Sequence, residues 1–325
     1  MDCLVKYMEG FVDMCKISVI LSTYNRQKLL PRMLDSLLNQ EFKDFELILV
    51  NNGSTDNTQS ICEEYAQKDQ RIKLYRIEKN NGPSFARNLG IDKAKGDYIC
   101  FVDDDDYCEQ NYLSMLYNLI TEYDSDIAIS GSVYEYNDKT ISPKYIFEGT
   151  YVYNKVEGVS EFLKREKYNT APATKLFKKE LFENVRFISG VKIDDIHVIY
   201  KLFVNANKVV VNGIPIYRFH KHSGNMTGFI QKDILTPEIL DDYLNMQKER
   251  VQYISERVPD LEKQVRYAEF SYMLSMVEKI NNGHSINCEL QYDIMIQKLC
   301  KNSDEILSCN WSTEREKDLM TKYVL

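Results

Sequence analysis

Four consecutive aspartates, Asp103 to Asp106, follow directly on the apolar run 98–102. A buried strand cannot continue through four carboxylates, so the strand should end where they begin. Because side chains alternate across a strand, Asp103 and Asp105 are expected to point one way, and Asp104 and Asp106 the other. Two carboxylates converging at the carboxyl end of a strand would favour a hard divalent cation. The alternative is a solvated acidic turn.

The chain before these aspartates alternates strands and helices. Apolar runs predict strands at 17–21, 45–50 and 72–77, and apolar residues at helical spacing predict helices at 29–38 and 83–94. Successive units of this kind favour a doubly wound, mostly parallel sheet in an α/β fold. The polar loops all follow strands, so they should line one rim of the sheet.

The second half of the chain is less regular. A tyrosine-rich stretch at 132–155 is interpreted as a hairpin or irregular insertion, and strands are expected at 208–211 and 215–219. From about residue 231 apolar residues recur at helical intervals, which predicts an all-helical C-terminal appendage. Its methionine and aromatic stripe is interpreted as core packing rather than a ligand or membrane face.

Composition narrows the class of protein. The 325 residues are 44% hydrophobic and 28% charged, which is typical of a folded soluble chain. With 41 Lys and Arg against 49 Asp and Glu, the net charge of -8 argues against nucleic acid as a partner. The eight cysteines form no CxxC pair, and no run of about 18 apolar residues occurs, so a cytoplasmic protein with reduced thiols is expected.

Four motifs occur in the order and spacing of the family-2 glycosyltransferases, and the chain strongly resembles that family from about residue 16 to residue 228. The motifs are Ile17 to Asn25, Gly53 to Asp56, Gly82 to Asn88 and Phe101 to Asp106. The resemblance implies a GT-A fold at 16–228, preceded by an N-terminal extension at 1–15 and followed by a helical C-terminal region at 229–325.

The resemblance also implies a nucleotide-sugar site. Thr23 and Tyr24 match residues that hold the nucleotide base, and Arg87 matches an arginine near the diphosphate. Asn52 stands where the family usually has an aspartate that accepts from uracil, and Asn51 also replaces an acid. An asparagine carbonyl can still accept that hydrogen bond, so a UDP-sugar is the expected donor; the alternative is that the asparagine NH₂ group faces a different base.

The acids take separate roles in the same resemblance. Asp103 and Asp105 match the outer members of the D-x-D motif, with Asp105 as the ligand of a divalent metal, Mn²⁺ or Mg²⁺, and Asp103 reaching the metal or the ribose. Asp104 joins the nucleotide-sugar contacts. Asp195 matches the catalytic base at a helix start, and Asp194 replaces the family's glutamate beside it as a contact for the acceptor or diphosphate.

Two histidines follow the last predicted strand. His220 and His222 lie where the family often has a basic or metal-contacting residue, so they are candidates to touch the diphosphate; the alternative is a pair of surface histidines.

The implied activity is a metal-dependent, inverting transfer of a hexosyl group from a nucleotide-sugar to a hydroxyl of a glycan or lipid-linked acceptor, in bacterial surface polysaccharide synthesis. The setting would be the cytoplasmic face of the membrane, with peripheral membrane contact and a homodimer left open. Two alternatives remain: a catalytically silent nucleotide-sugar-binding partner of another transferase, and a nucleotidyltransferase that uses the acids for two-metal chemistry.

Overall fold

The computed structural model describes residues 15–191, 193–222 and 234–325. The N-terminal extension expected at 1–15 lies outside these ranges except for Cys15, and so does the boundary expected between residues 228 and 229. All cysteines in the described ranges are free thiols, as expected.

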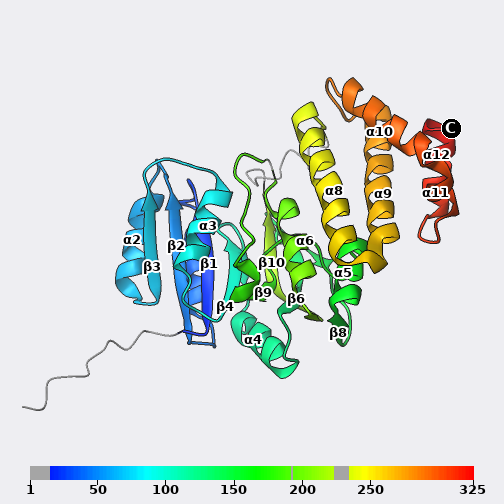
Figure 1. Ribbon diagram of the computed structural model, residues 1–325. Coiled ribbons are helices and arrows are strands. Elements are labelled where there is room, and N and C mark those ends of the chain that lie inside the picture. Colours follow the sequence, from blue (N-terminus) through cyan, green and yellow to red (C-terminus); the bar gives the residue numbers. More distant parts are fainter. Residues whose placement is uncertain (1–14, 192, 223–233) are drawn as a thin grey trace, which may run out of the picture.

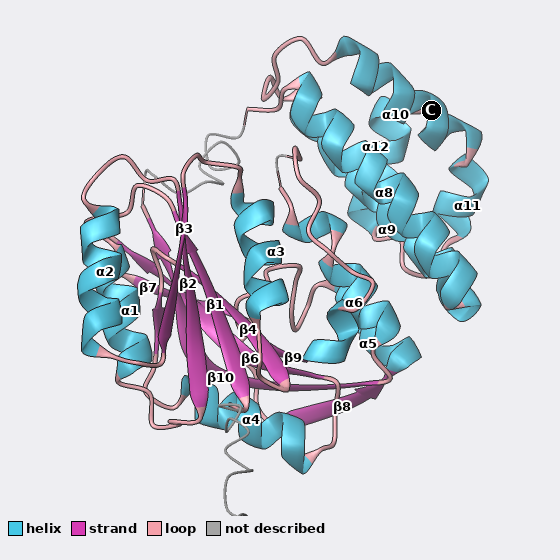
Figure 2. Ribbon diagram, turned by 60° about the vertical axis from the view of Figure 1, so that its left-hand side comes forward, coloured by secondary structure: helices cyan, strands magenta, loops and turns pink. Residues whose placement is uncertain are grey.

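A single ten-stranded sheet forms the centre of the molecule, in the order β3-β2-β1-β4-β9-β6-β10-β5, with β7 paired to β6 and β8 paired to β10 (Figures 1 and 2). Strands β1 to β4 are parallel to one another, as are β6 and β10. The strands are β1 (Ile17–Thr23), β2 (Phe45–Asn52), β3 (Ile72–Ile77), β4 (Tyr98–Asp103), β5 (Tyr107–Cys108), β6 (Ile127–Tyr136), β7 (Ile141–Lys144), β8 (Thr150–Asn154), β9 (Lys175–Lys178) and β10 (Lys208–Lys221).

Helices cover both faces of the sheet, so its central strands are buried on both sides and consist of continuous apolar runs. On β1, Val19 and Leu21 pack with α1, α2 and α4, whereas Ile20 packs with α3 on the other face, which α5 and α6 also cover. The helices are α1 (Leu30–Leu38), α2 (Thr58–Lys68), α3 (Pro83–Lys93), α4 (Tyr112–Glu122), α5 (Lys155–Lys164) and α6 (Ile199–Asn205), with short 3-10 turns η1 (Lys179–Phe182) and η2 (Asp195–His197). The expected doubly wound, mostly parallel α/β fold is confirmed.

The second half of the sheet contains the antiparallel pairs. The tyrosine-rich stretch is a hairpin, because β6 continues to Tyr136 and pairs with β7. Strand β9 enters between β4 and β6 and pairs antiparallel with both. The two strands expected at 208–211 and 215–219 are one strand, β10, whose register with β6 shifts around Pro215. Proline lacks the N–H that an undisturbed ladder needs.

The C-terminal helices have their own core and also pack on the sheet domain (Figure 1). Helix α8 contacts α6 and η2, and α9 contacts α5. These helices are α8 (Pro237–Arg257), η3 (Pro259–Leu261), α9 (Glu262–Asn281), α10 (Glu289–Lys301), α11 (Ser303–Ser308) and α12 (Glu314–Tyr323). Across the described ranges, no helix combines the length and the hydropathy that a membrane span requires.

One close approach fixes α3 on the sheet. A Cβ atom added at Gly90 would lie 2.4 Å from Cγ2 of Ile20, a buried side chain of β1. At Gly158 in α5 the corresponding contact, with Cγ2 of Val209, is 3.1 Å. Helix α3 can therefore lie this close to β1 only because residue 90 has no side chain.

We expect Gly90→Ala to lower the free energy of unfolding by about 1–3 kcal/mol, because the added methyl group must push α3 away from β1. The measurement is urea unfolding followed by circular dichroism. Gly158→Ala is the matched control, and it should change stability by less than about 1 kcal/mol, because its contact is looser and alanine favours the helix. Equal losses in the two variants would contradict this account of the α3 contact.

Candidate functional site

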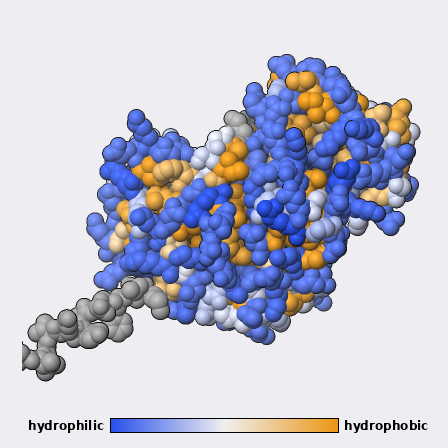
Figure 3. Space-filling model, in the orientation of Figure 1, coloured by the Kyte–Doolittle hydropathy of each residue, from blue (hydrophilic) through white to orange (hydrophobic). Residues whose placement is uncertain are grey.

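A cavity of about 680 Å³ lies at the carboxyl ends of the parallel strands. This is the rim where open α/β sheets bind ligands. Figure 3 shows that one face of the molecule is mostly hydrophilic, with hydrophobic side chains in separate patches. The cavity is lined by residues from the ends of β1, β2, β4 and β10, from the segments 169–172 and 193–196, and from α8 and α9.

The four aspartates begin at the last residue of β4 and form a fixed turn. Tyr217 of β10 fixes this turn with two hydrogen bonds. Its hydroxyl accepts from the backbone N–H of Asp103 at 3.1 Å and donates to Oδ2 of Asp106 at 2.8 Å. The backbone N–H of His220 donates to Oδ1 of Asp106, also at 2.8 Å. Asp106 is 3% exposed, and its carboxylate fixes the acidic turn to β10.

Strand alternation does not extend through this turn, because β4 ends at Asp103. Oδ1 of Asp104 accepts from Nε of Arg26 at 3.2 Å, and Oδ2 of Asp105 lies 3.0 Å from Nε2 of His222. Burial and the charge of Asp105 raise the pKa of Asp104 to about 7, and burial also raises the pKa of Asp103. Crowded carboxylates of this kind favour a bound cation.

The donor atoms at this turn are carboxylate oxygens with an imidazole beside them, a set that suits Mg²⁺ or Mn²⁺. In the described part of the chain, no group of three or more His, Cys, Asp or Glu side chains is arranged so that it could hold a metal ion. A site with one or two carboxylates is nevertheless usual for Mg²⁺, which keeps water ligands and binds substrate phosphates. The residues present therefore fit a divalent ion that is shared with a phosphorylated ligand.

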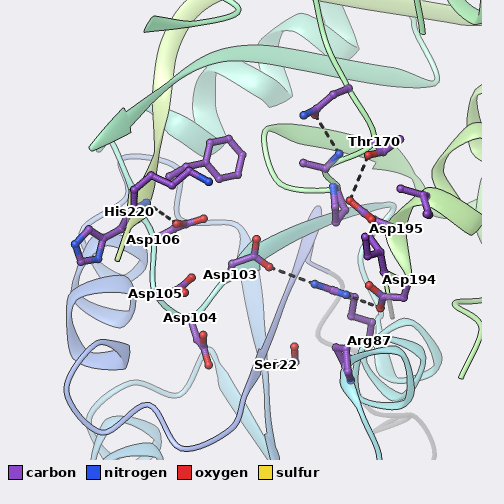
Figure 4. A pocket seen from close by; sticks show the side chains of 18 of the residues that line it. Ser22, Arg87, Asp103, Asp104, Asp105, Asp106, Thr170, Asp194, Asp195 and His220 are labelled. Carbon is purple, nitrogen blue, oxygen red and sulfur yellow. Dashed lines mark hydrogen bonds and ion pairs between the residues drawn. The ribbon is translucent and has the colours of Figure 1, made fainter. Parts of the chain in front are cut away.

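Arg87 of α3 joins the acidic turn to a second pair of aspartates (Figure 4). Its Nη1 lies 2.5 Å from Oδ2 of Asp194, and its Nη2 lies 3.3 Å from Oδ1 of Asp103. The Ser84 hydroxyl also donates to Oδ2 of Asp194, at 3.2 Å. Burial opposes the charge on Arg87, but the two carboxylates raise its pKa above the ordinary value. The sequence resemblance predicts Asp194 as a contact for the acceptor or diphosphate; in the structure its carboxylate pairs with Arg87.

Asp195 lies beside this pair at the start of η2, and its carboxylate lines the cavity. Oδ2 accepts from the Thr170 hydroxyl at 3.4 Å, whereas the buried Oδ1 has no hydrogen-bond partner among the described residues. Burial and the neighbouring Asp194 raise the pKa of Asp195 to about 6. A carboxylate in this state can accept a proton near neutral pH.

Helix α8 holds the segment that carries Asp195. Ile196 packs with Met246 of α8, and Nε2 of His197 lies 2.9 Å from Oδ1 of Asp242. The C-terminal helices thus fix the position of one of the cavity's acids.

The candidates for base recognition also line the cavity. Thr23 is buried at the end of β1, and Tyr24 is 39% exposed at the rim. Asn52 donates from Nδ2 to the Gly82 carbonyl at 2.9 Å, and its Oδ1 accepts from the Asn81 N–H at 3.2 Å. The amide of Asn52 therefore also shapes the loop that begins α3.

The two histidine side chains lie at the acidic turn. Their rings are 5.1 Å apart, with His222 beside Asp105 and Nε2 of His220 3.1 Å from Oδ1 of Asn137. The structure brings Thr23, Tyr24, Asn52, Arg87, His220 and both aspartate groups into one cavity, and His222 contacts it through Asp105.

Several cavity residues are absent from the expectations based on sequence. Arg26 contacts Asp104. It could have been identified from the sequence by its position in the same polar turn as Thr23 and Tyr24. Others are Lys144 of the hairpin, Arg165 after α5, Arg250 of α8 and Tyr272 of α9. For Arg250 the signal is a charged residue at helical spacing from Met246 and Ile254, within an otherwise apolar stripe.

The chain is similar to known proteins over most of its length. The sequence model of the family described as Glycosyl transferase family 2 matches residues 18–189. Among curated proteins, glycosyltransferase GlyG of Streptococcus pneumoniae is 33% identical over 65% of this chain and 72% of its own length. The cholesterol galactosyltransferase of Borreliella burgdorferi is 30% identical over 92% of this chain and 85% of its own length.

Among solved structures, residues 1–349 of TarS from S. aureus, in complex with UDP-GlcNAc, superpose with a TM-score of 0.70 at 24% identity. The match covers 94% of this chain and 83% of that one, so the shared fold includes the C-terminal helices as well as the sheet. The family match and the identity with curated members agree with the motifs around Thr23, Arg87 and Asp103. This chain belongs to the family-2 glycosyltransferases.

Proposed function

We propose that this protein is an inverting glycosyltransferase that uses a UDP-sugar. The acceptor would be a hydroxyl of a glycan or lipid-linked glycan, in the synthesis of a bacterial surface polysaccharide at the cytoplasmic face of the membrane. The family supports transfer from an activated sugar, and TarS, which shares the fold, was solved with UDP-GlcNAc. The observation that carries the proposal is the state of Asp195, whose Oδ1 is buried and unpartnered beside the cavity.

Asp195 is the proposed general base. An acceptor hydroxyl is far too weakly acidic to ionise at neutral pH, so a carboxylate within hydrogen-bond reach must take its proton as it attacks the anomeric carbon. Thr170 holds one oxygen of Asp195, which leaves the other for the hydroxyl. One base without a covalent nucleophile gives a single displacement, and therefore inversion of configuration.

The donor would lie along the strand ends. The nucleoside would be surrounded by Thr23, Tyr24, Asn52 and Asp104, and the diphosphate would face Arg87. The two ion pairs of Arg87 occupy Nη1 and Nη2, and a guanidinium has five N–H donors in total, so donors remain for phosphate oxygens.

The metal site is assigned to Asp105 and Asp103, with His222 and His220 beside them. A divalent ion held there would neutralise the charge that develops on the departing diphosphate. Nε2 of His222 lies 3.0 Å from Asp105, which fixes the orientation of that carboxylate.

We expect Asp195→Asn to reduce transfer by about 10²–10⁴-fold, because general-base catalysis is lost. The assay is release of nucleoside diphosphate from a panel of UDP-, GDP- and TDP-sugars, with Mn²⁺ or with EDTA. Binding of UDP, measured by calorimetry, should remain within about threefold of wild type. Wild-type turnover in Asp195→Asn would refute the assignment, and UDP binding without any turnover in the wild-type protein would favour the silent binding partner.

The pH dependence of kcat should report the titration of Asp195. Burial raises the pKa of Asp195 to about 6, and only the deprotonated form can accept a proton. At saturating donor, kcat should therefore rise about tenfold per pH unit up to about pH 6 and level off above it. Donor binding followed over the same pH range separates this effect from titration at the metal site. A flat kcat profile between pH 5 and 8 would contradict the role of Asp195.

Asp194 is expected to position Arg87. Asp194→Asn leaves a buried guanidinium with Asp103 alone, so the free energy of unfolding should fall by roughly 3 kcal/mol, and the affinity for UDP should weaken. Asp92→Asn is the matched control, because its ion pair with Arg186 is exposed and should contribute less than about 1 kcal/mol. Equal losses of unfolding free energy in the two variants, measured by urea unfolding, would show that the buried Arg87 network contributes no more to stability than an exposed ion pair.

A further inference from the structure

Helices α8 and α9 form the wall of the cavity beside Asp195. Tyr243, Gln247 and Arg250 come from α8, and Tyr272 comes from α9. Ile196, the residue after Asp195, packs with Met246 of α8. This wall is therefore attached directly to the segment that carries the proposed base.

Arg250 is a buried cation without a carboxylate partner in the described residues. It is 8% exposed, and its Nη2 donates to Oε1 of Gln247 at 2.5 Å, while its Nε has no hydrogen-bond partner. Glu269 of α9 is the carboxylate that acts on it electrostatically, but Glu269 is already paired with Lys298 at 2.6 Å. Burial, together with the positive charge of Arg165, lowers the pKa of Arg250 to about 10. A buried unpaired charge is costly to keep, so this arrangement indicates a missing anionic partner.

Other polar groups on the same side of the cavity also lack a hydrogen-bond or ion-pair partner in the described residues, although they are less buried than Arg250. The Tyr272 hydroxyl is buried and has no hydrogen-bond partner, and its ring stacks on Tyr243 with centroids 5.0 Å apart. Arg165, which is exposed, and Lys144, which is half-buried, have no ion pair in the described part of the chain. Nζ of Lys144 lies over the ring of Phe219, 4.3 Å from its centroid. By contrast, Asp103, Asp104 and Asp194 all have cationic partners.

We infer that this wall is the acceptor subsite and that it binds an oxyanion, a phosphate or a carboxylate, that the acceptor carries near its reacting hydroxyl. The inference rests on the proposed function, because it takes Asp195 as the group that contacts that hydroxyl. A planar guanidinium with a free Nε–H matches the geometry of such an oxyanion, and the Tyr272 hydroxyl supplies a further donor. The donor's diphosphate does not need these groups, since Arg87 and the acidic turn already face it.

The test is calorimetric titration of the full chain, in the presence of UDP and Mn²⁺, with glycerol 3-phosphate and with glycerol as its neutral match. Glucuronate and glucose form the second pair, which separates a phosphate site from a carboxylate site. We expect the anionic member of at least one pair to bind and the neutral member not to. Arg250→Gln and Arg165→Gln should each weaken that binding at least tenfold. Arg257→Gln, an exposed arginine of α8 outside the cavity, should leave it unchanged.

The outcomes separate the two proposals. The inference would be overturned if the protein shows no preference for the anionic probes while it still binds UDP. It would also be overturned if binding of the anionic probes persists in both arginine variants, because such binding is adventitious only. Failure of the wild-type protein to bind UDP or to turn over any donor would instead refute the proposed function. Arg165 is exposed, so its variant should fold even if Arg250→Gln does not, and Tyr272→Phe gives a second test on the buried side of the wall.

Discussion

The buried guanidinium of Arg87 is the interaction on which the arrangement of the site depends. It reaches Asp194 with one nitrogen and Asp103 with another, and so connects the strand-end acids to the segment that contains Asp195. Removing one partner from a buried ion network leaves an uncompensated charge, which costs far more than losing an exposed pair. Arg87 can reach both sides because α3 lies directly on β1, an approach that requires Gly90 one turn further along the helix. Packing in the core thereby sets the distance between the two groups of acids.

The rim of the sheet was predictable because it follows from local patterns. Each apolar run that ends in polar residues marks the carboxyl end of a strand, and parallel strands bring all such ends to one edge. That reasoning places Thr23, Asn52 and Asp103 together without any knowledge of the loops between them, and the structure has them lining one cavity. The C-terminal helices were equally predictable from their period. Local sequence patterns do not identify Asp195 as a site residue, and only the family resemblance indicates it.

Other features depend on contacts between distant segments, which local patterns do not report. Alternation fails after Asp103 because the strand ends there, and the direction of the Asp106 side chain is set by Tyr217 and His220 of β10. The insertion of β9 between β4 and β6 likewise depends on pairing across the sheet. The aromatic stripe of the C-terminal helices is typical of core packing, and most of it packs in the core, yet Tyr243 lines the cavity together with Tyr272, which lies next to the stripe in the sequence. A stripe of this kind does not reveal which of its members face a gap between two packed units.

One side of the cavity comes from the sheet domain and the other from the C-terminal helices, and this division has a physical reason. The family match ends at residue 189, so it includes Thr23, Arg87 and the acidic turn but neither Asp195 nor α8. A nucleoside diphosphate presents the same groups whatever sugar it carries, and a rigid sheet edge suits a ligand of fixed shape. An acceptor differs between enzymes, and a wall of helices can change its side chains without disturbing the sheet. Because α8 packs on the segment of Asp195, the element that would select the acceptor also positions the base that would activate it.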